Sequence, residues 1–164
     1  MGRWNTGFRR RQDDTLMRVE DALRGVAHLG LDTTPVVYFV EGNPEFHARC
    51  VPFFAAIDNG EIEAITSPIT LPEALVHPLR TGDASRATAF RTLLLATQGI
   101  TTVPLTVVIA ERTARLRADY NLRTPDAVQI ATALLSGCDA FLTNDEKLKR
   151  VTELRVIVVT DLTL

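Results

Sequence analysis

The stretch TPDAVQIATALLSGCDAFLTND, residues 124–145, decides the fold, because a helix pattern passes directly into a strand pattern. Thr124 suits a helix N-cap, Pro125 suits the first turn, and Gly137 suits the position just past the helix end. The following run AFLT is short and apolar, as in a strand that is covered on both faces. A helix that leads into a buried strand is part of a βαβ unit, so this stretch predicts an α/β protein.

The same alternation extends over the rest of the chain. Further short apolar runs predict strands at 27–32, 61–66, 100–104, 140–144 and 155–159. The segments between them carry helical patterns. Strands that are separated by helices pair in parallel, with helices on both faces of the sheet. We therefore predict a three-layer α/β/α sandwich with a central parallel sheet of about five strands.

The N-terminal region differs from this pattern. Residues 1–14 are polar and basic without a hydrophobic period, which predicts a flexible arm. Leu16, Val19 and Leu23 then recur at helical spacing, so a short amphipathic helix is expected to end near Arg24. We expect residues 1–27 to form an arm with a short helix and residues 28–164 to form one domain.

Composition narrows the class of function. Hydrophobic residues make up 46% of the chain, charged residues make up 23%, and the formal net charge is −2. A nucleic-acid partner would therefore need a local basic patch or a metal ion, because the whole surface is not basic. The two cysteines lack zinc-site spacing, and no apolar run approaches the roughly 18 residues of a membrane span. These features predict a cytoplasmic protein with no membrane contact.

Four acidic residues are expected at one edge of the sheet: Asp32, Glu73, Asp126 and Asp145. Two follow predicted strands and two lie in the first turns of helices, where parallel sheets gather functional groups. Each also has a simpler interpretation, as a helix cap or as a partner of the helix dipole. Carboxylates that converge in one cleft repel each other unless a cation compensates them. Their hard oxygens suit Mg²⁺ or Mn²⁺.

Four stretches resemble a PIN domain, in particular the VapC-like toxin ribonucleases of bacterial toxin–antitoxin pairs. They are LDTTPVVYFVEGNP (31–44), SPITLPEALVHPLRTGD (67–83), LRTPDAVQIATALLSGCDAFLTNDEKL (122–148) and LRVIVVTDL (154–162). The resemblance implies that the four acids are catalytic and bind Mg²⁺ or Mn²⁺, with Thr143 as a supporting hydroxyl. It also implies an RNA substrate, a homodimer and a small antitoxin protein. Gln129 departs from the pattern, since relatives often carry a histidine there.

The expected function is therefore that of a metal-dependent endoribonuclease that hydrolyses RNA phosphodiester bonds, as the toxin of a type II toxin–antitoxin pair. A solitary RNA-processing nuclease and a non-catalytic RNA-binding PIN module are the alternatives. A haloacid-dehalogenase-like phosphatase would need a second Asp two residues after Asp32, where this chain has Thr34. A receiver-type signalling domain would need adjacent acids early in the chain and a lysine after a late strand.

Overall fold

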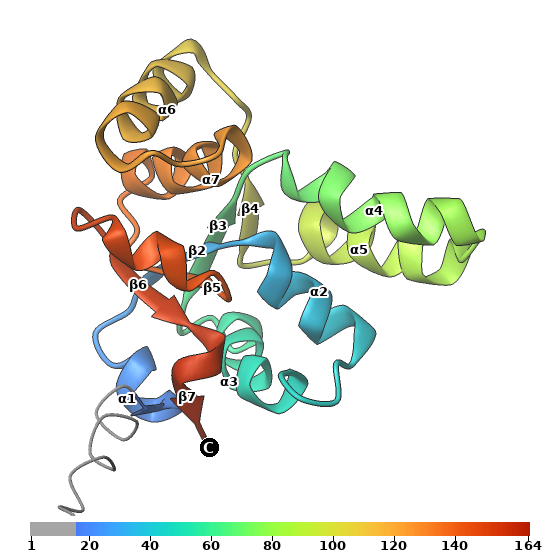
Figure 1. Cartoon of the computed structure of the whole chain (residues 1–164). Coiled ribbons are helices and arrows are strands. Elements are labelled where there is room, and N and C mark those ends of the chain that lie inside the picture. The colour runs from blue at the N-terminus through green and yellow to red at the C-terminus, as the bar shows by residue number, and fades with distance from the viewer. Residues whose placement is uncertain (1–15) are drawn as a thin grey trace, which may run out of the picture.

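The computed structural model describes residues 16–164, so the predicted arm at residues 1–14 lies outside the described part (Figure 1). The strands are β1 (Met17–Arg18), β2 (His28–Leu31), β3 (Glu63–Thr66), β4 (Ile100–Thr102), β5 (Ala140–Thr143), β6 (Arg155–Val158) and β7 (Leu162–Thr163). The α-helices are α1 (Val19–Leu23), α2 (Thr33–Glu41), α3 (His47–Asp58), α4 (Thr70–Thr81), α5 (Ala84–Ala96), α6 (Val107–Tyr120) and α7 (Thr124–Leu135). Two short 3₁₀ helices follow, η1 (Glu146–Arg150) and η2 (Val159–Asp161).

The central sheet has five parallel strands in the order β4-β3-β2-β5-β6. One core cluster joins one face of this sheet to helices α1 to α5, and a second joins the other face to α6 and α7. Figure 1 shows α6 and α7 together on one side of the sheet, with α4 and α5 extending from the other. The three-layer α/β/α fold with a five-stranded parallel sheet is thus confirmed.

The middle of the sheet is built for burial on both faces. Leu29 and Leu31 of β2 are fully buried in the first core cluster, while Gly30 faces the opposite side. A Cβ added at Gly30 would lie 2.6 Å from the Phe141 ring and 2.8 Å from the Ala133 Cβ. Glycine at this position therefore lets α7 pack closely against β2. This contact sets the distance between the helix that carries Asp126 and the central strands.

The N-terminal region is more closely integrated than its sequence predicted. Met17 and Arg18 pair in parallel with Leu162 and Thr163, so they form a strand rather than the start of a helix. The helix α1 has only five residues, and its Val19 is buried in the main core. Strand pairing with the C-terminal end removes the first turn of the predicted helix. The domain boundary at residue 28 stays a prediction.

The start of α7 also differs from the prediction. Arg123 is the N-cap residue, Thr124 is the first helical residue, and no side-chain capping bond forms. Pro125 has no N–H group, so one of the amides that a cap would satisfy is missing. Within residues 16–164, no helix has the length and apolar character that a membrane crossing requires.

Candidate metal-binding active site

Asp32 is held at the carboxyl end of β2 by contacts to both of its carboxylate oxygens. It is the N-cap of α2, where Oδ1 accepts a hydrogen bond of 2.8 Å from the Thr33 backbone N–H. Its Oδ2 accepts a bond of 2.6 Å from the Thr143 hydroxyl at the end of the neighbouring strand β5. The resemblance implied Thr143 as a supporting hydroxyl, and its hydroxyl contacts Asp32 directly.

Burial and neighbouring acids both disfavour the charged form of Asp32. The pKa of Asp32 is raised from 3.8 to about 6, and the largest cause is burial, which leaves only 8% of the residue exposed. Hydrogen bonds from Thr143 and Thr33 lower the pKa, while the negative charges of Asp126 and Glu73 raise it further. A cation near these groups would therefore stabilise the charged form of Asp32.

Glu73 lies in the first turn of α4, across from the start of α2. Its Oε2 accepts a short hydrogen bond from the Thr33 hydroxyl. Thr33 thus contacts two of the four acids, through its backbone N–H to Asp32 and through its side chain to Glu73. The side chain of Glu73 is exposed, so it lies at the rim and not in the core.

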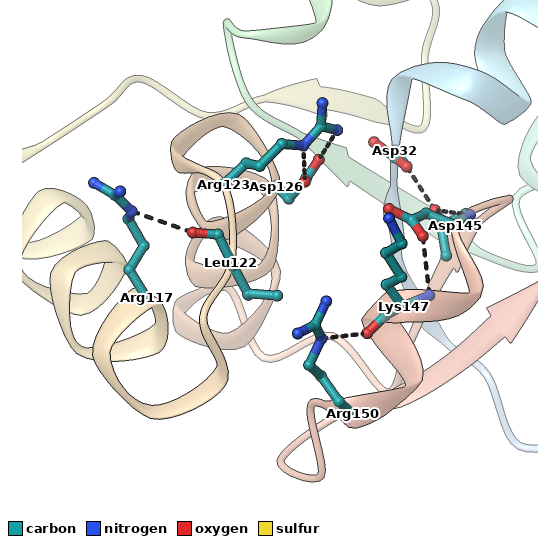
Figure 2. Close-up of polar contacts among 9 residues, drawn as sticks. Asp32, Arg117, Leu122, Arg123, Asp126, Asp145, Lys147 and Arg150 are labelled. Atoms are coloured by element: carbon teal, nitrogen blue, oxygen red, sulfur yellow. Dashed lines mark hydrogen bonds and ion pairs between the residues drawn. The ribbon is translucent and has the colours of Figure 1, made fainter.

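Asp126 lies in the first turn of α7 and is engaged by Arg123. The guanidinium donates from Nε to Oδ2 at 2.9 Å and from Nη2 to Oδ1 at 3.2 Å, so both carboxylate oxygens are occupied (Figure 2). This bond raises the pKa of Arg123, as do the charges of Asp126, Asp145 and Glu73. Arg123 was not among the residues predicted from the sequence, although its spacing of three residues from Asp126 at a helix start is typical of an ion pair.

Asp145 follows β5 and caps the 3₁₀ helix η1. Its Oδ1 accepts a hydrogen bond of 2.9 Å from the Lys147 backbone N–H, and its own N–H donates to the Thr143 hydroxyl at 3.0 Å. Thr143 therefore links Asp145 to Asp32, and Figure 2 shows these two acids close together at the strand ends. Asp145 therefore caps η1, as its simpler interpretation predicted, and also lies beside Asp32.

A buried network of hydrogen bonds connects the elements that carry the acids. Gln129 of α7 donates to the Thr70 hydroxyl at 2.6 Å and accepts from the Ser67 backbone N–H at 3.2 Å. Thr66 bonds the Thr70 hydroxyl at 2.7 Å and donates to the Leu31 carbonyl at 3.0 Å. These bonds tie α7 and the start of α4 to the ends of β2 and β3. Gln129 can act as donor and acceptor together, which explains its fit at this position.

The chemistry of the donors fits a hard divalent cation, but their rotamers face protein groups. Within residues 16–164, no three His, Cys, Asp or Glu side chains form an arrangement ready to hold a metal ion. Arg123 pairs with both oxygens of Asp126, and backbone amides donate to one oxygen each of Asp32 and Asp145. Electrostatic coupling joins all four acids through Asp32 and Arg123. A cation bound by Asp126 would compete with Arg123 for the negative charge of this carboxylate.

A parallel sheet with acidic residues at its carboxyl edge defines a class of α/β proteins that includes several families. The chain belongs to the PIN domain family, whose model matches residues 30–154. Among curated proteins, none matches this chain at a significant level.

Several solved structures share the fold. A toxin–antitoxin complex from Klebsiella pneumoniae is 22% identical with a TM-score of 0.63, and the match covers 81% of this chain and 98% of that one. VapBC2 from Rickettsia felis, bound to a promoter DNA fragment, is 15% identical with a TM-score of 0.62 over 80% and 98% of the two chains. Mycobacterium tuberculosis VapC20, a toxin that cleaves the sarcin–ricin loop, is 16% identical with a TM-score of 0.63 over 79% and 99%. The chain thus has a VapC-like PIN fold.

Proposed function

We propose that this protein is a metal-dependent endoribonuclease that hydrolyses RNA phosphodiester bonds and acts as the toxin of a type II toxin–antitoxin pair. The observation that carries the proposal is the electrostatic convergence of four acids from separate elements of a PIN fold. Asp126 and Glu73 both raise the pKa of the buried Asp32, and Asp145 shares the Thr143 hydroxyl with it. An arrangement of like charges at this cost is expected where a cation binds.

Each side chain has a distinct role in the proposal. Asp32, Asp126 and Asp145 would hold Mg²⁺ or Mn²⁺, and Glu73 would complete the acidic ring and orient water. The ion would supply charge neutralisation at the phosphoryl oxygens and activation of water. Thr143 positions Asp32 by its bond of 2.6 Å. Because the hydrogen bonds from Thr33 and Thr143 orient the Asp32 carboxylate, little reorganisation of Asp32 would be needed on substrate binding.

Cleavage of a mixed RNA pool by the purified protein tests the nuclease proposal. Reactions with Mg²⁺, Mn²⁺ or chelator would be compared for the wild type, Asp126→Asn and the control Asp58→Asn. Asp58 is exposed at the end of α3, at the opposite edge of the sheet, so its substitution removes one charge without touching the acidic cluster. We expect metal-dependent cleavage that Asp126→Asn abolishes and Asp58→Asn retains. A folded wild type that cleaves nothing with either metal would instead favour a non-catalytic RNA-binding module.

The toxin proposal rests on the VapC-like fold and is tested separately. We expect expression of the wild type to arrest bacterial growth and Asp126→Asn to relieve the arrest. Coexpression of a small protein encoded beside this chain should also relieve it, and light scattering should show a homodimer of the free toxin. Cleavage of RNA without growth arrest would favour a solitary RNA-processing nuclease.

A further inference from the structure

A cavity of about 400 Å³ lies beside the acidic cluster, between the loop that joins α6 to α7 and the 3₁₀ helix η1. Asp126 and Asp145 line it on the acidic side, and both belong to the proposed metal site. Arg123, Lys147 and Arg150 also line it. Carboxylates and cations therefore share one cavity, although the chain as a whole carries a net charge of −2.

Lys147 and Arg150 are placed together by the local helix geometry. In a 3₁₀ helix the side chains at positions i and i+3 lie on the same side. Arg150 Nε donates a hydrogen bond of 2.8 Å to the Lys147 carbonyl, which orients the guanidinium. Leu148 between them is buried and anchors the turn in the core below α6 and α7. Figure 2 shows both cationic side chains extending from η1 on the side that faces α7 and its preceding loop.

These two cations share the cavity with Asp126 and Asp145 but do not pair directly with either acid. Neither Lys147 nor Arg150 forms an ion pair with any of residues 16–164. Their neighbour Lys149, which does not line the cavity, pairs with Asp161 of η2. The segment therefore separates one structural lysine from two cations that remain available to a ligand.

The loop that joins α6 to α7 forms the opposite wall of the cavity, and its backbone is fixed by local contacts. Asn121 ends α6 in the left-handed conformation with φ of 52°, and Arg117 Nε donates to the Leu122 carbonyl at 3.2 Å. Leu122 is buried, so the loop is anchored on the core while its polar edge lines the cavity. A preformed cavity with two aligned cations suits an anionic group better than a flexible basic surface does.

We propose that Lys147 and Arg150 form a subsite for a backbone phosphate of RNA next to the phosphate that is cleaved. The inference rests on the proposed nuclease function and adds the residues that orient the strand. With the scissile phosphate at the acids, a neighbouring phosphate of the same strand would enter the basic side of the cavity. These residues would position the strand and would not take part in bond cleavage.

Salt-dependent RNA binding tests the subsite without catalysis. A fluorescein-labelled 20-nucleotide single-stranded RNA of mixed sequence would be titrated in chelator, so that no cleavage occurs, and followed by anisotropy at several salt concentrations. The double variant Lys147→Gln/Arg150→Gln would be compared with Arg80→Gln/Arg91→Gln, which also removes two positive charges. Arg80 and Arg91 are exposed on α4 and α5, without ion pairs among residues 16–164 and outside the cavity.

Each phosphate contact on a single strand contributes about 0.7 to the slope of log affinity against log salt concentration. The loss of two contacts should therefore make the slope shallower by about 1.4. If the variant and the wild type bind RNA equally at 1 M salt, the variant should bind about 25-fold more weakly at 0.1 M salt. The Arg80/Arg91 variant should keep the wild-type slope. With Mg²⁺ present, the Lys147/Arg150 variant should raise KM more than it lowers kcat.

An unchanged slope in the Lys147/Arg150 variant, or an equal loss in the control variant, would overturn the subsite. Cleavage by a wild type whose binding does not depend on these residues would refute the subsite and leave the nuclease proposal standing. Binding that depends on them, without cleavage under any metal, would refute the nuclease proposal and reduce the subsite to a phosphate-binding site of a non-catalytic RNA-binding module. Thermal unfolding of both double variants should match the wild type, because all four side chains are exposed.

Discussion

Substitution of Asp32 by Asn should change how the stability of the metal-free protein depends on pH. The folded protein holds a proton on Asp32 with a pKa of about 6, against 3.8 as the ordinary value. This raised pKa means that the folded state binds the proton more tightly than the unfolded state does. Its contribution to stability is therefore complete below pH 3.8 and is lost as pH rises through 6.

The magnitude follows from the size of the shift. A shift of roughly 2 pKa units corresponds to about 3 kcal/mol over the whole pH range, of which about 1.4 kcal/mol falls between pH 5 and pH 8. Asn cannot ionise but keeps an oxygen that can accept one of the two hydrogen bonds. The wild type should therefore lose about 1.4 kcal/mol more than Asp32→Asn between these two pH values.

Urea unfolding followed by circular dichroism, in chelator at pH 5 and pH 8, measures this difference. Titrating groups that do not interact with Asp32 are common to both proteins, so they cancel when the two pH dependences are subtracted. Addition of Mg²⁺ at pH 8 should stabilise the wild type and have less effect on Asp32→Asn. Equal pH dependence in the two proteins, or a larger loss in the variant, would refute the argument that Asp32 is buried with its charge uncompensated.

Three further predictions concern the hydrogen bond to Asp32, the packing of β2 and the ion pair of Asp126. Thr143→Val should destabilise the metal-free protein by about 1–3 kcal/mol at pH 8, because an oxygen of the buried Asp32 loses its hydrogen-bond donor. Thr143→Ser should keep most of the stability, and urea unfolding would measure both variants. Gly30→Ala should cost about 1–3 kcal/mol in the same assay, since its Cβ would overlap α7 and β5; an unchanged midpoint would contradict the close packing. Arg123→Gln should strengthen Mn²⁺ binding in calorimetry, because both oxygens of Asp126 become free; weaker binding would mean that Arg123 supports the site.

Much of the fold could be predicted from local patterns. The buried run at 140–143 and the helix signals around Pro125 and Gly137 predicted β5 and α7, and the alternation of elements predicted the parallel sheet. The N-terminal segment was predicted less well, because the pairing of Met17 with Leu162 joins residues that are far apart in the chain. No periodicity within residues 16–27 carries information about a strand that lies near the other end.

The sequence by itself determined which acids stand at the ends of strands and helices, because element boundaries depend on local propensity and hydrophobic period. The hydroxyl of Thr143 was expected only from the resemblance to PIN domains. Only the tertiary structure decided what each acid contacts: Thr143 bonds Asp32, Thr33 bonds Glu73, and Arg123 covers Asp126. Burial and charge coupling depend on distances between separate elements. The pKa of Asp32 and the cavity between η1 and α7 therefore follow from packing, which no local pattern contains.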